Sequence, residues 1–410
     1  MKYIVALVAL LVAPLTAQAV SIDLVTVGNP GNASEIQGAV IVGRVTTTYR
    51  IAKTEVTNSQ YVEFLNAKAA SDPFELYNTS MSFLSQGGIT RSGATGSYTY
   101  AVKASVPGEG PGGTNYTYAD KPVSLVSWYD AIRFANWMSN GQGSGSTETG
   151  AYTILGGTPT PTNGTTITRN AGATWYLPNE NEWYKAAYFN GATSTYSDYP
   201  AGTDTVPNNN LPSADTGNSA NFMAADFTTS NFSYPNTAVG TYTLSDSSYG
   251  TLDQGGNVAE WNETSAGSGN RVRRGGAWSD VSSVLSSATR ETIGAGVENN
   301  ATGFRLAAIA LAAPVPGDYN ANGVVDSADY VVWRDHLGTS FQLQNEVAST
   351  TPGTVTQEDY TEWRARFGNT SGSGTGSSLQ NAAVPEPNVW ILSLVALTLS
   401  AASTNRSRRA

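Results

Sequence analysis

The chain has 410 residues, of which 40% are hydrophobic and 13% are charged, and its formal net charge is −10. This length allows a sizeable core in one large domain or a few ordinary ones. The acidic balance argues against a nucleic-acid partner, because phosphate binding needs a basic face. The absence of cysteine excludes disulfides and thiolate nucleophiles, and a single histidine, His336, excludes a histidine-cluster metal centre.

Residues 1–19 have the features of a secretory signal. Lys2 precedes a short apolar run, and Ala17-Gln18-Ala19 forms a small-residue cleavage motif. Because the apolar run is too short to span a membrane comfortably, the pattern favours a cleaved signal over a membrane anchor. We therefore expect an exported protein.

Residues 20–312 are predicted to form the main domain. β-Branched segments broken by glycine predict strands over Ser21–Val27 and Ala39–Tyr49. Thr57 and Gln60 form a capping box, and helical spacing of apolar residues predicts a helix from about Asn58 to Ala70. Residues 71–120 are rich in glycine, serine and tyrosine without periodicity, so we expect a long insertion.

Two further helices are predicted by similar start signals. Ser127 with Asp130 opens one helix, and Asn179 with Glu182 opens another. Residues 139–171, between them, have low complexity and predict loop or edge hairpin. The tryptophans around these helices are interpreted as core residues whose indole N–H groups are satisfied locally: Trp128, Trp137, Trp175 and Trp183.

The order of these motifs resembles the formylglycine-generating enzyme (sulfatase-modifying factor) family, from about Val40 to Ala308. The resemblance rests on EVTNSQYVEFLNA, PVSLVSWYDAIRFANWMS, WYLPNENEWYKAAYF, DQGGNVAEW, RVRRGGAW and TGFRLA. It implies a single, loop-rich α+β domain that is related to the C-type lectin-like fold and often stabilised by calcium.

The resemblance also locates the family's reaction centre. In catalytic members, two cysteines bind copper(I) and oxidise a substrate cysteine to formylglycine; the matching positions here are Asp280 and Leu285. Neither side chain is a soft ligand for copper(I), so we expect no copper and no catalysis. A related branch uses iron bound by several histidines, which this chain lacks. The alternative function is a divergent formylglycine-generating oxidase that modifies sulfatases, or a hydrolase on the same scaffold, and only family membership supports it.

Two calcium sites are implied by the resemblance within the main domain. Oxygen ligands of mixed carboxylate, amide and carbonyl character suit calcium. For Glu260, a lone acid beside Trp261, the alternative is a buried hydrogen bond to backbone donors. The expected ligands are Asp253, the carbonyls of Gly256 and Val258, and Glu260 at one site, and Asn221, the carbonyl of Phe222, and Asn231 at the other.

Several arginines surround the former reaction centre. Arg305, in the Gly303-Phe304-Arg305 motif, is expected to pair with a core carboxylate. The others offer a polar, aromatic groove for a glycan or peptide ligand, although for each arginine singly a structural ion pair is the alternative. The predicted groove residues are Arg274, Trp278, Ser279, Asp280 and Arg290.

Residues 313–370 predict a second, α-helical module after the Pro-rich linker Ala313–Pro316. Its loop has oxygen side chains at EF-hand positions and glycine at the sixth position, with aspartate in place of glutamate at the twelfth. DYVVWR from Asp329 repeats as DYTEWR from Asp359, and the loop before the second copy lacks the ligands. The segment resembles a dockerin module and implies a cohesin-like partner, whereas an Asx-turn loop without metal is the alternative. The predicted calcium ligands are Asp318, Asn320, Asn322, Val324 through its carbonyl, Asp326 and Asp329.

Residues 371–383 predict a flexible tether, and residues 384–410 resemble a PEP-CTERM sorting signal. Pro385-Glu386-Pro387 precedes a short apolar run and a basic tail. The resemblance implies a membrane transpeptidase that recognises and removes this segment, and a permanent tail anchor is the alternative. We therefore expect an exported, surface-associated binding protein at the cell envelope.

Overall fold

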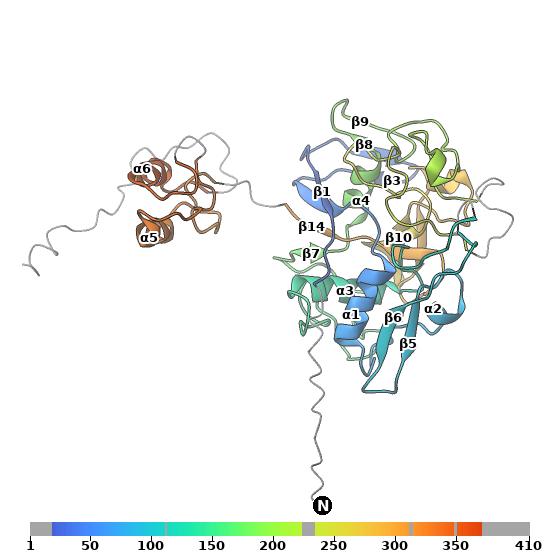
Figure 1. The fold of residues 1–410 in the computed structure, drawn as a ribbon. Coiled ribbons are helices and arrows are strands. Elements are labelled where there is room, and N and C mark those ends of the chain that lie inside the picture. Colours follow the sequence, from blue (N-terminus) through green and yellow to red (C-terminus); the bar gives the residue numbers. More distant parts are fainter. Residues whose placement is uncertain (1–18, 111–112, 224–233, 311–314, 348–350, 371–410) are drawn as a thin grey trace, which may run out of the picture. The chain divides into compact units, whose positions relative to one another are not determined.

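The structure is a computed structural model that describes residues 19–110, 113–223, 234–310, 315–347 and 351–370 (Figure 1). The chain divides into two compact units, Met1–Ala310 and Leu311–Ala410, and each is described by itself. The predicted signal before Ala19, the tether and the sorting signal lie outside the described residues. Within the described ranges, no helix is long and apolar enough to cross a membrane.

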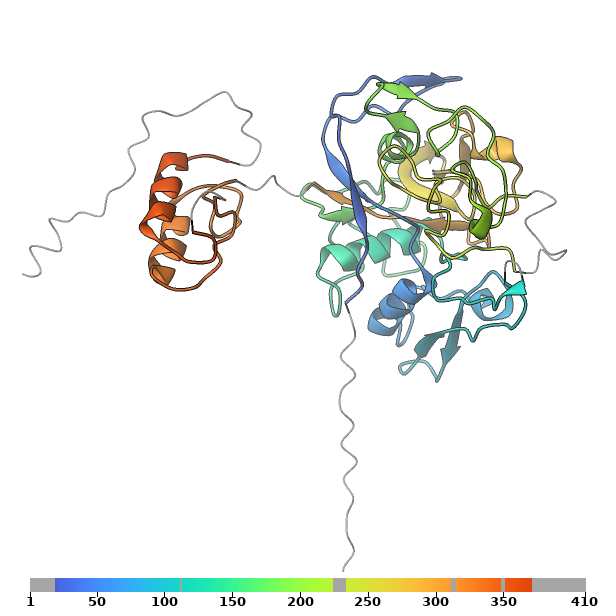
Figure 2. The ribbon, with the colours of Figure 1, turned by 45° about the horizontal axis from the view of Figure 1, so that its top comes forward.

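The first unit contains two four-stranded sheets (Figures 1 and 2). The first sheet has the order β1-β4-β14-β7, formed by Leu24–Val27, Tyr49–Ala52, Ala307–Ile309 and Trp175–Tyr176, with antiparallel neighbours. The second has the order β12-β11-β10-β13, formed by Glu291–Gly294, Asn270–Arg274, Ala259–Gly267 and Thr302–Phe304; only its β10–β13 pair is parallel. The motifs that carry the family resemblance thus supply all or part of β7, β10, β11, β13 and β14, whereas β1, β4 and β12 lie outside them.

Three capped helices pack around these sheets, as the sequence predicts: α1 (Asn58–Lys68), α3 (Trp128–Ser139) and α4 (Glu180–Tyr188). Each begins with a complete capping box, in which the N-cap side chain accepts from the third helical N–H and the third side chain bonds back. Aromatic rings of α1 and α3 interlock, with Phe64 at 5.3 Å from both Phe134 and Trp137. Trp128, Trp137 and Trp183 are buried as predicted, whereas Trp175 is only half-buried.

The predicted insertion, residues 71–120, contains regular structure. It contains the short helix α2 (Ser80–Phe83) and a hairpin of β5 (Ile89–Ser92) and β6 (Thr99–Val102). The side chain of Asn66, in α1, bonds to both backbone polar groups of Tyr100, at 2.8 and 2.9 Å. Ile89 and Tyr100 are buried in the main core. The hairpin is therefore held by a helix outside the segment, a contact that no local pattern reveals.

The remaining regular elements of this unit are short. Two further hairpins pair β2 (Glu35–Gln37) with β3 (Val40–Val42) and β8 (Phe189–Asn190) with β9 (Thr195–Tyr196). Two 3-10 helices, η2 (Pro212–Ala214) and η3 (Ser282–Leu285), lie in the long connections. Much of the unit is therefore loop, and its backbone groups need partners other than sheet neighbours.

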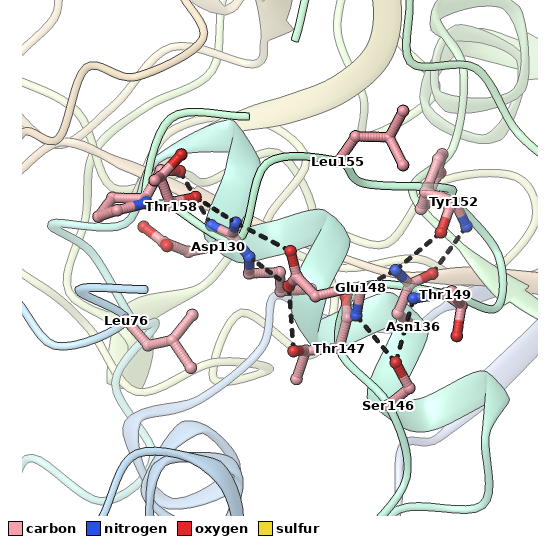
Figure 3. Close-up of polar contacts among 12 residues, drawn as sticks. Leu76, Asp130, Asn136, Ser146, Thr147, Glu148, Thr149, Tyr152, Leu155 and Thr158 are labelled. Carbon is pink, nitrogen blue, oxygen red and sulfur yellow. Dashed lines mark hydrogen bonds and ion pairs between the residues drawn. The ribbon is translucent and has the colours of Figure 1, made fainter. Parts of the chain in front are cut away.

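Side chains of α3 supply such partners to the loop that follows it (Figure 3). The amide of Asn136 donates to the carbonyls of Thr147 and Tyr152, at 2.7 and 3.0 Å, and accepts from the Tyr152 N–H at 2.7 Å. Fully buried Arg133 pairs with Glu148 at 2.8 Å and donates to the carbonyl of Thr158 at 2.9 Å. The low-complexity segment 139–171 is thus ordered by polar contacts with a helix.

The second unit contains α5 (Ser327–His336) and α6 (Gln357–Arg366), which pack against each other. Their contacts are reciprocal: the indole of Trp333 donates to the Thr356 carbonyl at 2.7 Å, and that of Trp363 donates to the Asp326 carbonyl at 2.9 Å. Asp326 and Thr356 are the N-cap residues of the two helices. The tryptophan of each repeat therefore binds the N-cap residue of the other repeat's helix. The repeat in the sequence thus corresponds to a repeated contact in the structure.

Candidate functional site

The turn after β11 carries the first position at which the resemblance places a catalytic cysteine. Asp280 occupies it, and its carboxylate accepts from the Ala277 N–H at 2.8 Å while its own N–H donates to the Ala277 carbonyl at 2.9 Å. Gly275 precedes the turn with φ +95°, and a Cβ there would lie 2.7 Å from the Gln254 carbonyl oxygen. The side chain of Asp280 thus closes its own turn.

The second cysteine position is occupied by Leu285, at the end of η3. Its side chain is fully buried and packs with Tyr199, Ala220 and Phe222 in a small apolar cluster. An apolar side chain in close packing offers neither a metal ligand nor a nucleophile. At the first of the two positions the side chain therefore closes a backbone turn, and at the second it packs in the core.

In the structure, the predicted groove residues fall into two sets: two arginines that bind Glu180, and three half-buried residues of the turn after β11. Glu180, the first residue of α4, accepts from Arg274 at 2.6 and 2.9 Å and from Arg290 at 2.9 and 3.1 Å. Arg274 is buried and also donates to the carbonyls of Ser287 and Thr289, at 3.0 and 2.7 Å. Of the other predicted groove residues, Trp278, Ser279 and Asp280 are half-buried. Arg274 and Arg290 therefore form a structural ion pair with Glu180.

Glu260 forms a second buried ion pair. Both of its oxygens accept from Arg305, at 2.7 Å each, and one also accepts from the Trp183 indole at 2.7 Å. The side chains of Glu260 and Arg305 are 1% and 0% exposed. The expectation that Arg305 pairs with a core carboxylate is confirmed. The partners of Glu260 differ from both readings of the sequence, which assigned it to calcium or to backbone donors.

The other residues of this predicted calcium site lie in the preceding turn. Asp253 has φ +60°, and its carboxylate accepts from the Gly240 N–H at 2.5 Å. Burial raises the pKa of Asp253 to about 6. The carboxylate of Glu260 already has three donors, so the four residues do not present a free set of oxygens around one point. Calcium at Asp253, Gly256, Val258 and Glu260 stays a prediction.

The second predicted calcium site has buried oxygen atoms without partners. Asn221 is 1% exposed; its amide nitrogen donates to the Pro235 carbonyl at 2.9 Å, and its Oδ1 accepts no hydrogen bond from the described residues. The neighbouring Asn236 is equally buried, and neither of its side-chain polar atoms has a partner in the described part of the chain. Unpaired buried polar atoms are costly, and amide oxygens are ligands that calcium accepts. The donor set therefore fits a cation at Asn221.

Sequence reasoning missed Asn236, which lies in a polar loop without any motif. The predicted ligand Asn231 lies outside the described residues, and the Phe222 carbonyl accepts from the Asn209 amide at 3.2 Å. Asn221 lies directly against Gly256 in an isolated parallel bridge, where a Cβ on Gly256 would lie 2.1 Å from the Asn221 carbonyl oxygen. Glycine at position 256 is thus required for the close approach of the two predicted calcium segments.

The EF-hand-like loop of the second unit is closed by its own side chains. The carboxylate of Asp318 accepts from the N–H groups of Asn322 and Gly323, at 3.1 and 2.8 Å. That of Asp329 accepts from the N–H groups of Asn320 and Asp326, at 3.0 and 2.8 Å. Gly323 has φ +88°, as the sharp turn at the sixth position requires.

This loop offers oxygens of several kinds to a cation. Among the described residues, no group of three or more acidic, cysteine or histidine side chains by itself forms a metal-binding cluster. A cation here would therefore also need the amide oxygens of Asn320 and Asn322 and the carbonyl of Val324, which is the mixed set of an EF-hand loop. Burial raises the pKa of Asp329, and the charges of Asp318 and Asp326 add to this effect. The donor chemistry fits calcium.

The architecture of the first unit agrees with a comparison against known families. The model of the "Sulfatase-modifying factor enzyme 1-like domain" matches residues 26–310. The chain belongs to this family. Its sulfatase-modifying-factor domain is accordingly the first unit, with mixed helices and strands as expected of the α+β class.

Solved structures with similar folds include CarF, at 23% identity and a TM-score of 0.45, where the match covers 71% of this chain and 99% of CarF. Treponema denticola variable protein 1 matches at 20% identity and a TM-score of 0.41, over 73% of this chain and all of that protein. PvdO from Pseudomonas aeruginosa matches at 14% identity and a TM-score of 0.38, over 70% of this chain and 92% of PvdO. No curated protein matches the chain.

Proposed function

We propose that this protein is an exported, surface-associated binding protein whose sulfatase-modifying-factor domain has lost oxidase chemistry and binds a glycan or protein ligand. The main support is Leu285, which fills a fully buried apolar position where the reaction of the family needs a thiol. Asp280, at the other thiol position, closes a backbone turn. The alternative, a divergent formylglycine-generating oxidase, has support from family membership alone.

Oxygen consumption separates these two functions. The purified protein is incubated with copper(I) and a cysteine-containing sulfatase peptide, and the peptide mass is followed together with dissolved oxygen. We expect no formylglycine and no oxygen uptake above the copper-only control. Copper-dependent conversion of the peptide over many turnovers would establish the oxidase instead.

We further propose that calcium stabilises the main domain at Asn221 and Asn236. The support is their unpartnered buried amide oxygens, which a bound cation would satisfy. Calcium should raise the melting temperature of the first unit and a chelator should lower it. Asn236→Leu should abolish the difference between the two conditions. A wild-type melting temperature that is the same in calcium and in chelator would contradict the proposal.

For the second unit we propose a dockerin-like module with one calcium ion in the loop that ends at Asp329. The support is the mixed oxygen set of this loop and the reciprocal packing of the two helices. Asp359 provides a matched control, because it occupies the capping position of Asp329 and accepts from the Thr356 N–H at 2.7 Å, while its loop lacks the other ligands. In a calcium titration, Asp329→Ala should lose the site and Asp359→Ala should keep it. Equal calcium affinity in the two variants would refute the assignment.

The location and partners that we propose rest on the predicted signals at the two ends of the chain and on the dockerin-like second unit. A cohesin-like protein is the proposed partner of residues 313–370, and a sorting transpeptidase is proposed to act at Pro385-Glu386-Pro387. Cell fractionation tests this: the wild-type protein should reach the envelope without residues 384–410. Replacement of Glu386 by Ala should leave the uncleaved protein in the membrane. Full-length wild-type protein in the envelope would instead indicate a permanent tail anchor.

A further inference from the structure

A cleft of about 400 Å³ on the first unit has neither Asp280 nor Leu285 in its lining. Six of its ten lining residues carry hydroxyl or amide side chains, while apolar atoms, including those of Leu211, make up more of the exposed lining than polar atoms do. Among the described residues that line it, only Lys121 is charged. Such a cleft combines one cation with several hydrogen-bonding groups, which is the arrangement of a polar ligand site. The polar lining includes Asn115, Thr117, Lys121, Ser213 and Thr241.

Lys121 is unusual among the lysines of the described region. It is 5% exposed, and its ammonium lies 4.5 Å from the centre of the Tyr116 ring. Within the described ranges, no hydrogen bond or ion pair to this ammonium is found. Burial lowers the pKa of Lys121 to about 8. The charge of the neighbouring Asp120 partly opposes this shift, without a hydrogen bond to the ammonium. A buried ammonium without a hydrogen-bonded anion is costly, and an anion that enters the cleft would reduce that cost.

Lys103 provides the contrast. Its ammonium also lies over a tyrosine, 4.6 Å from the centre of the Tyr118 ring. It donates to the carbonyls of Leu84 and Gly87, at 2.8 and 3.1 Å, and it does not line the cleft. The two lysines share the same aromatic support, but only Lys121 lies in a cleft without a protein acceptor. This difference points to a ligand rather than to a structural role.

We propose that this cleft binds a uronic acid residue of an acidic polysaccharide, with its carboxylate on the ammonium of Lys121. The neutral hydroxyl and amide groups of Ser213, Thr117 and Asn115 suit the hydroxyls of a sugar ring, and Leu211 suits its C–H face. An acidic peptide would satisfy the ammonium but would leave these groups without hydroxyl partners. The net charge of −10 opposes anions at long range, but at physiological salt this repulsion is screened beyond roughly 8 Å. The inference rests on the proposed binding function and gives it a site and a ligand class.

The test uses the full-length protein and methyl β-D-glucuronide as the probe, with methyl β-D-glucoside as its neutral counterpart. Calorimetric or NMR titration should give an affinity for the glucuronide at least tenfold above that for the glucoside. Lys121→Met keeps the aliphatic stem on Tyr116 and should lower the glucuronide affinity at least tenfold. Lys103→Met, the matched control, should leave it unchanged.

The melting temperature of each variant is measured as a control, to show that the variant is folded. If Lys121→Met does not fold, Ser213→Ala tests the cleft at an exposed lining position, and it should weaken glucuronide binding without changing the melting temperature. Equal affinity of the wild type for both glycosides, or undiminished binding by the cleft variants, would overturn the assignment. Binding of hexaglutamate through Lys121 without binding of the glucuronide would also overturn it. These failures are distinguishable from failure of the proposed function, which the oxygen-consumption assay decides independently.

Discussion

The buried pair of Glu260 and Arg305 offers the sharpest test of what holds the first unit together. In Glu260→Gln, one carboxylate oxygen becomes an NH2 group that faces a guanidinium donor. Arg305 would keep its bonds to the carbonyls of Ala52, Lys53 and Leu252, at 3.0, 3.1 and 2.8 Å. Its charge, however, would remain buried without a hydrogen-bonded carboxylate, because Glu55 and Asp253 act on it only through space.

The structure sets the size of the effect. The two side chains are 1% and 0% exposed and share two contacts of 2.7 Å. Removal of one partner from a buried pair costs about 3–5 kcal/mol, because the other charge is left uncompensated. At about 2–4 °C per kcal/mol for a domain of this size, the melting temperature should fall by roughly 6–20 °C.

Thermal unfolding measures this loss against a matched control. Glu291 pairs with Arg273 at 3.3 Å, and these side chains are 30% and 18% exposed. Glu291→Gln should therefore cost less than about 1 kcal/mol. Both variants are measured in calcium and in a chelator, since Glu260 was also a predicted calcium ligand. A loss below about 1 kcal/mol for Glu260→Gln, or a loss that vanishes in chelator, would refute the ion-pair account.

Three further outcomes are expected. Leu285→Ala should lower the free energy of unfolding of the first unit by about 2–5 kcal/mol in denaturant titration, because it leaves a cavity in a packed cluster; a loss near zero would mean that the site collapses or is open. Trp363→Phe should cost the second unit about 1 kcal/mol through loss of the bond to the Asp326 carbonyl, and a thermal transition of that unit unchanged from wild type would contradict the reciprocal packing. Burial lowers the pKa of Lys185 to about 8, below its unfolded value, so the free energy of unfolding should rise with pH from about 8 to 10. Lys185→Met should flatten that rise in denaturant titrations across the range, and an equal slope in the variant would contradict it.

The helix starts could be predicted because their signals are local. Thr57, Ser127 and Asn179 each cap a helix through a residue three positions later, so the whole motif is visible in a short stretch of sequence. The glycine at position 323 is another local signal. The order of such motifs also identified the family before any tertiary contact was known.

The side-chain partners could not be predicted, because they depend on contacts between distant segments. Glu180 is 94 residues from Arg274, and its position on a capped helix N-terminus gives no sign of two arginine partners. The sequence pattern assigns these arginines to a ligand groove or to a structural ion pair, but it identifies no acidic partner for the pair. Asn236 and Lys121 were missed because neither belongs to a motif, and only burial distinguishes each from its polar neighbours.

The buried arginines of the first unit share one structural role, which is to donate hydrogen bonds to backbone carbonyls. A domain built largely of loops has many carbonyls outside its sheets, and each needs a donor when it is buried. A guanidinium supplies five donors in a fixed plane, so one carboxylate can neutralise it while the remaining donors reach the backbone. Arg133, Arg274 and Arg305 each follow this pattern, with an acid on one side and two or three backbone carbonyls on the other.

Because each buried arginine binds several backbone carbonyls, a small number of charged residues is enough to satisfy the buried loops. The same contacts make these arginines poor candidates for ligand binding, since their donors are already occupied. Only 13% of the residues are charged, and several of the arginines among them are buried. Each buried guanidinium joins segments that are far apart in sequence, as Arg305 joins the carbonyls of Ala52 and Leu252. A cation that can contact a ligand must therefore be one that is not already used as a donor to buried backbone carbonyls or to a buried carboxylate. Lys121 meets this condition among the described residues of the cleft, whereas Arg274 and Arg290 do not.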